Sequence, residues 1–234
     1  MIHWLTQTHT ELPALTQAFE KGWYLTEEEE QRFSALHTEK RRHDWLLGRW
    51  TAKRLLQTVI WEKNGTSLPL DLITITNNND GVPDYRLPIQ DRNFSISISH
   101  SHGRAFAAAI ERPNAPIGAD LERIAARPEG FIEAYFTPEE QTAVLQCATE
   151  AMQNTLTTAI WSAKEAALKA LHLGLSVDTL AVRCLIEPIV HQPHNWLPFA
   201  VVCDNGRLPQ PAPSLTGWWC VEDEFVLTVV AGDM

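Results

Sequence analysis

Asp120 and Glu122 lie two positions apart in a segment, 117–122, whose pattern predicts a β-strand. Side chains at this spacing project from one face of a strand, and Gly118 allows another backbone segment to approach closely. Two convergent carboxylates repel each other unless a proton or a cation lies between them. Mg²⁺ suits such a pair because it prefers oxygen ligands. The alternative is an ordinary solvated strand face.

Trp161, Glu165 and Lys169 form a second candidate group, because each follows the last by four residues on a predicted helix, 155–173. A Glu–Lys pair at this spacing is also the favoured orientation of a surface ion pair. The helix is otherwise rich in apolar residues, which indicates that it packs in a core. We therefore expect the charged stripe to face a cleft.

Ser99 and His100 lie at the end of a predicted strand, 94–99, in which polar and apolar residues alternate. Hydroxyl and imidazole groups at a strand exit can donate hydrogen bonds to a phosphate. A zinc site is not indicated, because no Cys or acidic partner lies at ligand spacing. A serine hydrolase is not indicated either, because adjacent strand residues point to opposite faces and no Gly-x-Ser-x-Gly elbow occurs. The simpler alternative is a structural histidine.

Arg42, Arg49 and Lys53 share one face of a long predicted helix, 39–62. Basic stripes of this kind are most often solvated. In a protein with a formal net charge of −10, concentrated cations are also a candidate anion site. The spacing alone leaves both interpretations open.

The composition is that of a soluble globular protein, with 234 residues, 44% hydrophobic and 21% charged. No signal peptide or membrane-length apolar run is evident. The acidic balance argues against broad binding to nucleic acid or anionic membranes. The cysteines show no disulfide or metal spacing, which favours reduced thiols and a cytoplasmic location. They are Cys147, Cys184, Cys203 and Cys220.

The predicted elements describe an α+β chain of two halves, 1–112 and 113–234. Besides the elements above, a capping box at Thr26 predicts a helix to about residue 35, and Thr137-Pro138 predicts one to about residue 150. We find no internal sequence repeat, and the segment 77–91 is expected to be turns. The remaining predicted strands are 72–76, 104–110, 180–187, 199–204, 217–222 and 225–231.

In combination, these residues resemble the 4'-phosphopantetheinyl transferases of the Sfp type. That family carries a Gly-x-Asp-x-Glu strand and, some forty residues later, a Trp-x-x-Lys-Glu-x-x-x-Lys helix. The order and spacing agree over roughly residues 26–180. The matching segments are Gly118 to Glu122, Trp161 to Lys169, Asn93 to Ser101, and Leu46-Leu47-Gly48-Arg49.

The resemblance implies a pseudo-twofold fold of two similar α+β halves, with coenzyme A bound in the cleft between them. It also implies that the N-terminal half forms the nucleotide and 3'-phosphate side, and the C-terminal half the metal and catalytic side. By residue, Asp120, Glu122 and Glu165 would bind Mg²⁺; Lys164 and Lys169 would neutralise phosphate; and Ser99, His100, Arg42 and Arg49 would hold the nucleotide. Glu165, Lys169 and Asp120 would be catalytic.

The expected activity is therefore Mg²⁺-dependent transfer of 4'-phosphopantetheine from coenzyme A to a serine of an apo acyl or peptidyl carrier protein. A Mg²⁺-dependent nucleotide pyrophosphate hydrolase is the alternative enzyme, and a non-catalytic carrier- or nucleotide-binding module is the alternative outside catalysis. The partners expected are carrier domains and coenzyme A, with the protein acting as a monomer. One departure from the family is Gly81-Val82-Pro83, which lacks the frequent Gly-Lys-Pro lysine; Arg86 is the candidate replacement.

Overall fold

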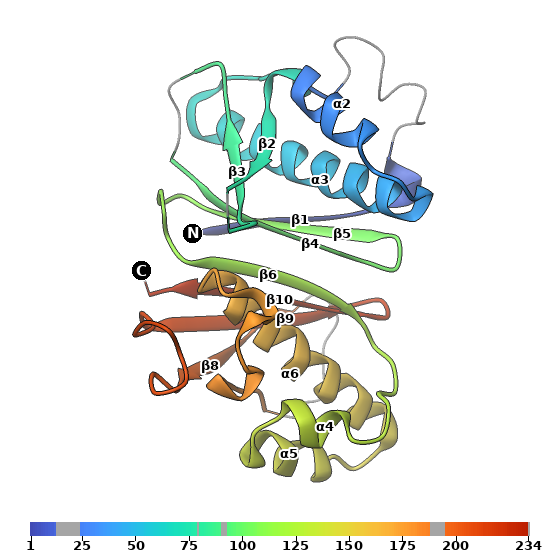
Figure 1. Cartoon of the computed structure of the whole chain (residues 1–234), viewed down its shortest axis with the longest axis vertical. Helices are drawn as coiled ribbons and strands as arrows, with labels where there is room; N and C mark the ends of the chain where they lie inside the picture. Colours follow the sequence, from blue (N-terminus) through green and yellow to red (C-terminus); the bar gives the residue numbers. More distant parts are fainter. Residues whose placement is uncertain (13–23, 79, 90–92, 188–194, 234) are drawn as a thin grey trace. The chain divides into compact units, whose positions relative to one another are not determined.

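The protein folds into two compact units, Met1–Ala115 and Pro116–Met234. The computed structural model describes residues 1–12, 24–78, 80–89, 93–187 and 195–233. Each unit packs helices against an antiparallel sheet (Figure 1), which confirms the α+β class. No described helix is both long and apolar enough to traverse a lipid bilayer.

Unit 1 is built on a three-stranded sheet covered by one long helix. The strands β1 (Ile2–Thr8), β5 (Arg104–Ile110) and β4 (Ser95–Ser101) lie in that order, and both pairings are antiparallel. The helix α3 (Glu39–Asn64) packs along them. The β4–β5 hairpin was predicted, whereas β1 was not. Its side chains are mostly half-buried, so β1 lacks clear alternation.

The helix boundaries in unit 1 follow the sequence signals. The helix α2 (Glu27–Ser34) begins with the predicted capping box at Thr26, and α3 ends at Gly65, whose φ of 70° is accessible to glycine without strain. The segment expected to be turns contains a strand, β3 (Pro83–Arg86), which pairs with β2 (Thr74–Asn77). Asn and Pro residues concealed this short hairpin.

Unit 2 contains a five-stranded antiparallel sheet covered by α6 (Glu150–Ala170). The helix expected to run to residue 150 ends earlier, because the Thr149 side chain accepts the N–H of Met152 and begins α6 there. The short helices α4 (Phe131–Tyr135) and α5 (Pro138–Leu145) precede it. The strands, in sheet order, are β6 (Ile117–Arg123), β10 (Phe225–Gly232), β9 (Leu215–Glu222), β8 (Leu197–Cys203) and β7 (Val182–Leu185).

A buried ion pair ties the elements of unit 1 together. The Lys53 ammonium, on α3, has no exposed surface and contacts the Glu29 carboxylate of α2. It also donates to the carbonyl oxygens of Tyr24 and Leu70. The second Glu29 oxygen accepts the N–H of Ile75 on β2 at 3.0 Å. One lysine and one glutamate thus connect two helices and a strand.

Unit 2 contains the same arrangement. Lys164 of α6 is fully buried, 2.8 Å from the Glu140 carboxylate of α5. Its ammonium donates to the carbonyl oxygens of Thr179 at 3.0 Å and Val182 at 2.5 Å. The second Glu140 oxygen accepts the N–H of Cys184 on β7 at 2.7 Å. Each contact has its counterpart in unit 1.

These two pairs reveal an internal repeat of structure, although the sequence shows no internal repeat. The glutamate and lysine are 24 residues apart in unit 1 and equally spaced in unit 2. The lysine ends a Trp-Thr-Ala-Lys segment at 50–53 and a Trp-Ser-Ala-Lys segment at 161–164. The identical positions are few and scattered, so the repeat is recognised from its contacts.

We predict that Lys53→Met lowers the free energy of unfolding by about 3–5 kcal/mol, because it leaves the Glu29 carboxylate buried without its counter-ion. Urea denaturation followed by tryptophan fluorescence measures this loss. Lys63→Met removes the more exposed Lys63–Glu111 pair and serves as the control. An equal effect of the two substitutions would contradict the role assigned to the buried pair.

Candidate metal and anion sites

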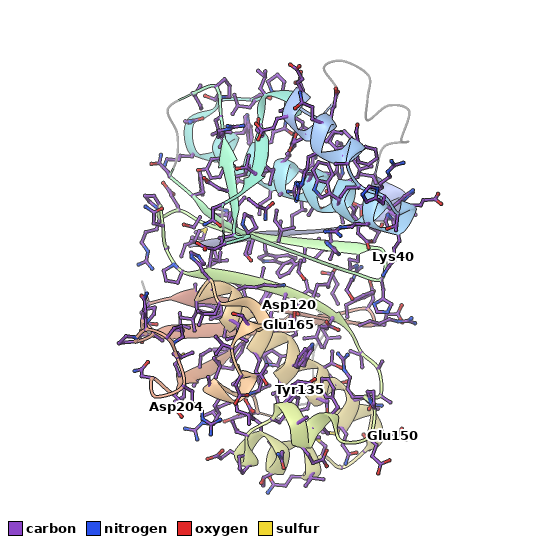
Figure 2. All side chains as sticks on the ribbon, in the orientation of Figure 1. Lys40, Asp120, Tyr135, Glu150, Glu165 and Asp204 are labelled. Carbon is purple, nitrogen blue, oxygen red and sulfur yellow. The ribbon has the colours of Figure 1, made fainter. Side chains whose placement is uncertain are left out.

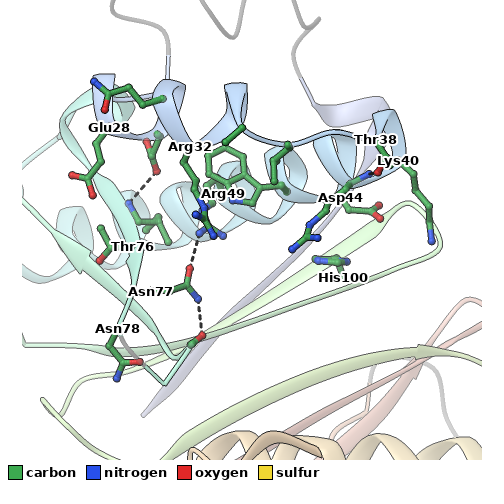
Figure 3. Close-up of a pocket in the computed structure, with 18 residues that line it drawn as sticks. Glu28, Arg32, Thr38, Lys40, Asp44, Arg49, Thr76, Asn77, Asn78 and His100 are labelled. Atoms are coloured by element: carbon green, nitrogen blue, oxygen red, sulfur yellow. Dashed lines mark hydrogen bonds between the residues drawn. The ribbon is translucent and has the colours of Figure 1, made fainter.

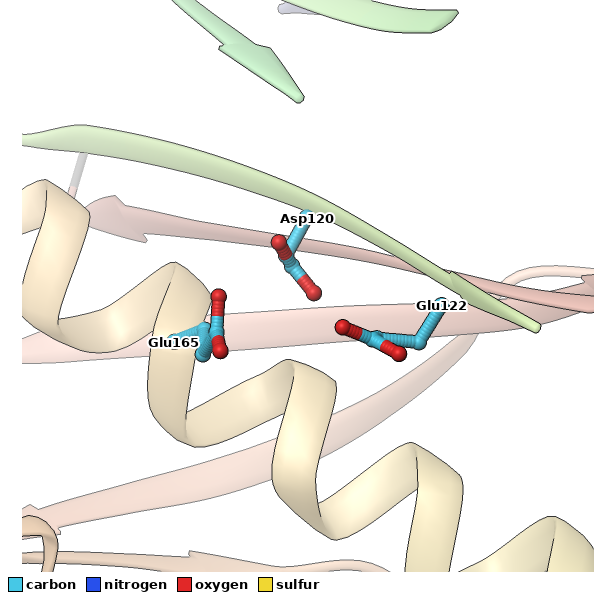
Figure 4. A group of neighbouring side chains, drawn as sticks. All are labelled: Asp120, Glu122 and Glu165. Atoms are coloured by element: carbon cyan, nitrogen blue, oxygen red, sulfur yellow. The ribbon is translucent and has the colours of Figure 1, made fainter. Parts of the chain in front are cut away.

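The three carboxylates singled out in the sequence converge within unit 2. Asp120 and Glu122 extend from one face of β6, and Glu165 extends from α6 (Figures 2 and 4). One oxygen of each lies within 4.8 Å of the others. Asp120 is 2% exposed, whereas Glu122 and Glu165 are half-buried. The site therefore has a closed side at Asp120 and an accessible side at the two glutamates.

Gly118 allows α6 to approach β6 closely enough to form this cluster. A Cβ atom at Gly118 would lie 1.8 Å from the carbonyl oxygen of Ala166, which no side chain could accommodate. The sequence suggested that this glycine allows a close approach, and the structure confirms it. The contact brings Glu165, one residue before Ala166, to the carboxylates of β6.

Burial and mutual repulsion raise the proton affinity of the two glutamates. The pKa of Glu165 rises to about 7, chiefly through burial and then through the Asp120 charge, with Lys169 opposing the rise. Burial and the Asp120 charge also raise the pKa of Glu122, against the effect of Arg127 at 3.1 Å. The cluster therefore favours a bound proton or cation. Three carboxylates are a donor set that fits Mg²⁺.

The two lysines assigned to phosphate have different environments. The Lys169 ammonium is 2.7 Å from Asp120 Oδ1 and 3.1 Å from the Ala119 carbonyl oxygen, and its side chain is 30% exposed. It therefore lies beside the cluster with an accessible surface. Lys164 is enclosed and paired with Glu140. The structure does not support its expected phosphate contact, because helical periodicity turns Lys164 away from the next residue, Glu165.

Unit 1 contains a cavity with a volume of about 1120 Å³, whose wall carries basic residues together with the acidic Glu28, Glu29 and Asp44 (Figure 3). Its wall includes Arg49 of α3 and His100 at the end of β4. Arg49 donates to Asn77 Oδ1 at 2.8 Å and stacks 4.6 Å from the Trp45 ring centre. Burial lowers the pKa of Arg49 to about 10, so it remains a cation at neutral pH. The other basic residues of the wall are Arg32, Lys40 and Arg41.

Two other residues expected to bind the nucleotide do not line this cavity. Arg42 Nε donates to the Leu36 carbonyl oxygen at 2.8 Å, and its guanidinium lies 5.4 Å from the Phe33 ring centre. Arg42 therefore anchors the start of α3, and its assignment to the nucleotide stays a prediction. Ser99 is buried, whereas the adjacent His100 is exposed, as expected for successive residues of a strand.

Several residues near the two sites were not identified from the sequence. Arg127 pairs with Glu122, and Ser162 donates to Asp120 at 2.8 Å. Arg127 lies in an irregular segment, so no periodicity placed it. Ser162 precedes Glu165 by three positions on α6, a spacing that puts two residues on the same helical side. That spacing was the one available signal.

Comparison with known proteins identifies the family. The sequence model described as the 4'-phosphopantetheinyl transferase superfamily matches residues 116–204. A holo-[acyl-carrier-protein] synthase of Anoxybacillus flavithermus (strain DSM 21510 / WK1) is 34% identical over 86 residues, which cover 37% of this chain and 71% of that protein. The chain therefore belongs to the 4'-phosphopantetheinyl transferase superfamily.

Solved structures of similar proteins include two holo-[acyl-carrier-protein] synthases. The Bacillus anthracis protein, in complex with CoA (3',5'-ADP), is 21% identical with a TM-score of 0.39, covering 46% of this chain and 91% of that one. The Helicobacter pylori protein, in complex with coenzyme A, is 20% identical with a TM-score of 0.35, covering 49% and 96%.

We predict that Lys164→Met mainly affects stability and that Lys169→Met mainly affects activity. Lys164→Met should lower the free energy of unfolding by about 3–5 kcal/mol, because Glu140 stays buried without a counter-ion. Lys169→Met should lower it by less, because its ammonium is partly exposed and Asp120 keeps its bond from Ser162. It should also impair transferase activity, because the ammonium lies beside the carboxylates. Thermal unfolding and activity are measured on both variants. Equal stability losses would contradict the distinction.

Proposed function

We propose that this protein transfers the 4'-phosphopantetheine group of coenzyme A to a serine of an apo carrier protein in a Mg²⁺-dependent reaction. The observation that carries the proposal is the convergence of Asp120, Glu122 and Glu165, with Lys169 beside them, inside the segment matched by the family. Mg²⁺ held by the three carboxylates would act as a Lewis acid for the diphosphate of coenzyme A.

The residues of the chain have separate tasks in this reaction. The carrier serine oxygen bonds to the β-phosphorus of coenzyme A, the bond from that phosphorus to the bridging oxygen breaks, and adenosine 3',5'-bisphosphate leaves. Glu165 is the candidate acceptor of the serine proton, because its carboxylate is partly accessible beside Asp120 and Lys169. Lys169 neutralises charge on the leaving phosphate. Asp120 and Glu122, together with Glu165, would hold the metal.

The cavity of unit 1 is the proposed site for the 3'-phosphate and nucleotide. Arg49 and His100 are retained from the sequence, and Arg32, Lys40 and Arg41 replace the unsupported contact of Arg42. The segment Gly81-Val82-Pro83 lacks the lysine that is frequent in the family. Gly81 lines the same cavity as Arg32, Lys40, Arg41 and Arg49, so these residues are candidates to supply the missing positive charge. Arg86 is paired with Glu28, so it is the weaker substitute.

We further propose that the protein is of the Sfp type. The same 86 residues form 71% of the Anoxybacillus relative but 37% of this chain, so the relative is roughly half as long. The repeated Lys–Glu arrangement supports a chain that carries the scaffold twice. The carrier-protein partner, the monomeric state and the cytoplasmic location remain predictions.

The transfer is tested by incubating the protein with coenzyme A, Mg²⁺ and apo carrier proteins, and reading intact masses. We expect one added phosphopantetheine on a carrier serine, abolished by EDTA. Glu165→Gln should lower turnover by about 10²–10⁴-fold, because it removes the proton acceptor and a metal ligand. Asp120→Asn should also lower it by orders of magnitude. Glu150→Gln, an exposed change on α6, serves as the control.

Other outcomes of this assay identify the alternatives. Release of adenosine bisphosphate from coenzyme A without carrier modification would indicate the hydrolase. Binding of coenzyme A or a carrier that survives EDTA, with no mass change, would indicate a binding module. Near-normal turnover of a folded Asp120→Asn protein would overturn the metal assignment while leaving the transfer activity intact.

A second prediction concerns the cavity. Arg49→Gln should raise the KM for coenzyme A about tenfold, the effect of losing a charge-assisted hydrogen bond. Its KM for dephospho-coenzyme A, which lacks the 3'-phosphate, should change little. Arg42→Gln is the matched control on the same helix and should retain the wild-type preference. Equal increases for both substrates would place the 3'-phosphate elsewhere.

A further inference from the structure

Two buried hydroxyl groups, those of Ser162 and Thr228, lie next to Asp120. Ser162 of α6 donates from Oγ to Asp120 Oδ2 at 2.8 Å. Thr228 of β10, opposite Asp120 in the strand register, places its Oγ1 atom 2.8 Å from Ser162 Oγ. Neither residue has exposed surface, and the other carboxylate oxygen, Oδ1, contacts Lys169. Both oxygens of Asp120 are therefore held.

The donor directions in this chain of hydroxyls are determined by counting protons. Ser162 has one hydroxyl proton, and it donates this proton in the hydrogen bond to the Asp120 carboxylate. Ser162 therefore has no proton left for Thr228, so Thr228 must be the donor in the bond between the two hydroxyls. The proton of Thr228 fixes the rotation of the Ser162 hydroxyl, and the Ser162 proton fixes the plane of the carboxylate. Consecutive hydrogen bonds of this kind polarise and strengthen one another.

The internal repeat provides a comparison for Ser162. Thr51 occupies the corresponding place in unit 1, two residues before Lys53, and is equally buried. Its hydroxyl donates to the Leu47 carbonyl oxygen one turn earlier in α3, at 2.8 Å, the usual partner of a helical Ser or Thr. The repeated scaffold therefore forms without a hydroxyl directed at the sheet. The bond from Ser162 to Asp120 is therefore specific to unit 2 and is not required by the repeated scaffold.

We propose that Ser162 is a positioning residue for the cation site and that Thr228 acts through it. This inference rests on the metal role assigned to Asp120 in the proposed function. With Ser162 present, the carboxylate is oriented before the cation arrives, so binding does not have to restrict its rotation. Partners that orient ligands in this way typically change metal affinity by 10–100-fold when removed.

The test is Mn²⁺ binding to the full chain without coenzyme A, followed by electron paramagnetic resonance of the free ion. Ser162→Ala should raise the Kd for Mn²⁺ about tenfold or more, and Thr228→Val should raise it less. The double variant should bind no more weakly than Ser162→Ala, because Thr228 acts only through Ser162. Thr51→Val, which removes the equally buried hydroxyl of unit 1, should leave the Kd unchanged.

Thermal unfolding of the same variants separates positioning from a structural role. Ser162→Ala leaves the Thr228 hydroxyl buried without its Ser162 partner. The double variant removes that hydroxyl as well and should recover part of the lost melting temperature, although Asp120 still lacks the Ser162 donor. Recovery of stability with persistently weak Mn²⁺ binding supports positioning. A wild-type Kd in Ser162→Ala, or affinity that recovers together with stability, overturns it. A wild-type protein that transfers phosphopantetheine but binds no Mn²⁺ would overturn the metal assignment as well.

Discussion

The buried pair of Lys164 and Glu140 is the interaction on which the position of the carboxylate cluster in unit 2 depends. Removing two ions from water costs several kcal/mol each, so such a pair persists only where hydrogen bonds satisfy both partners. Here two carbonyl oxygens and a strand N–H do so. The same contacts restrict rotation of α6 about its axis. Successive residues of a helix differ by about 100° around that axis, so Glu165 is directed away from the pair, toward β6.

The repeat shows that this scaffold is independent of the chemistry attached to it. Both units place a buried lysine on the long helix and a glutamate at the start of a shorter one. In unit 2 the residue after the lysine is Glu165, a member of the acidic cluster. In unit 1 it is Arg54, which is exposed, and the charged cavity forms at Arg49 instead. The buried pair preserves the helix position while the surrounding side chains differ.

Local signals predicted most of the helices and strands and singled out Asp120, Glu122 and Glu165 individually, whereas the grouping of the three came from the family resemblance. The capping box at Thr26 and the alternation before Ser99 depend only on residues that are neighbours in the chain, so they can be recognised in the sequence alone. The surroundings of Lys164 and Arg42 were not predicted, for a different reason. Charge and helical spacing do not show whether a cation has a buried partner, and those partners, Glu140 and the Leu36 carbonyl oxygen, are supplied by the tertiary fold.

The fold holds the three carboxylates close together although they repel one another, and their burial and hydrogen-bond partners differ. Asp120 is enclosed, with Lys169 on one oxygen and Ser162 on the other. Glu122 and Glu165 are more accessible. Burial and the Asp120 charge raise their pKa values, and the nearby cations Arg127 and Lys169 offset only part of this rise. Gly118 allows α6 to contact β6, and this contact places Glu165 close to Asp120 and Glu122. A bound proton or a divalent cation would relieve the repulsion that the packing imposes, and this distinguishes the cluster from a solvated acidic surface.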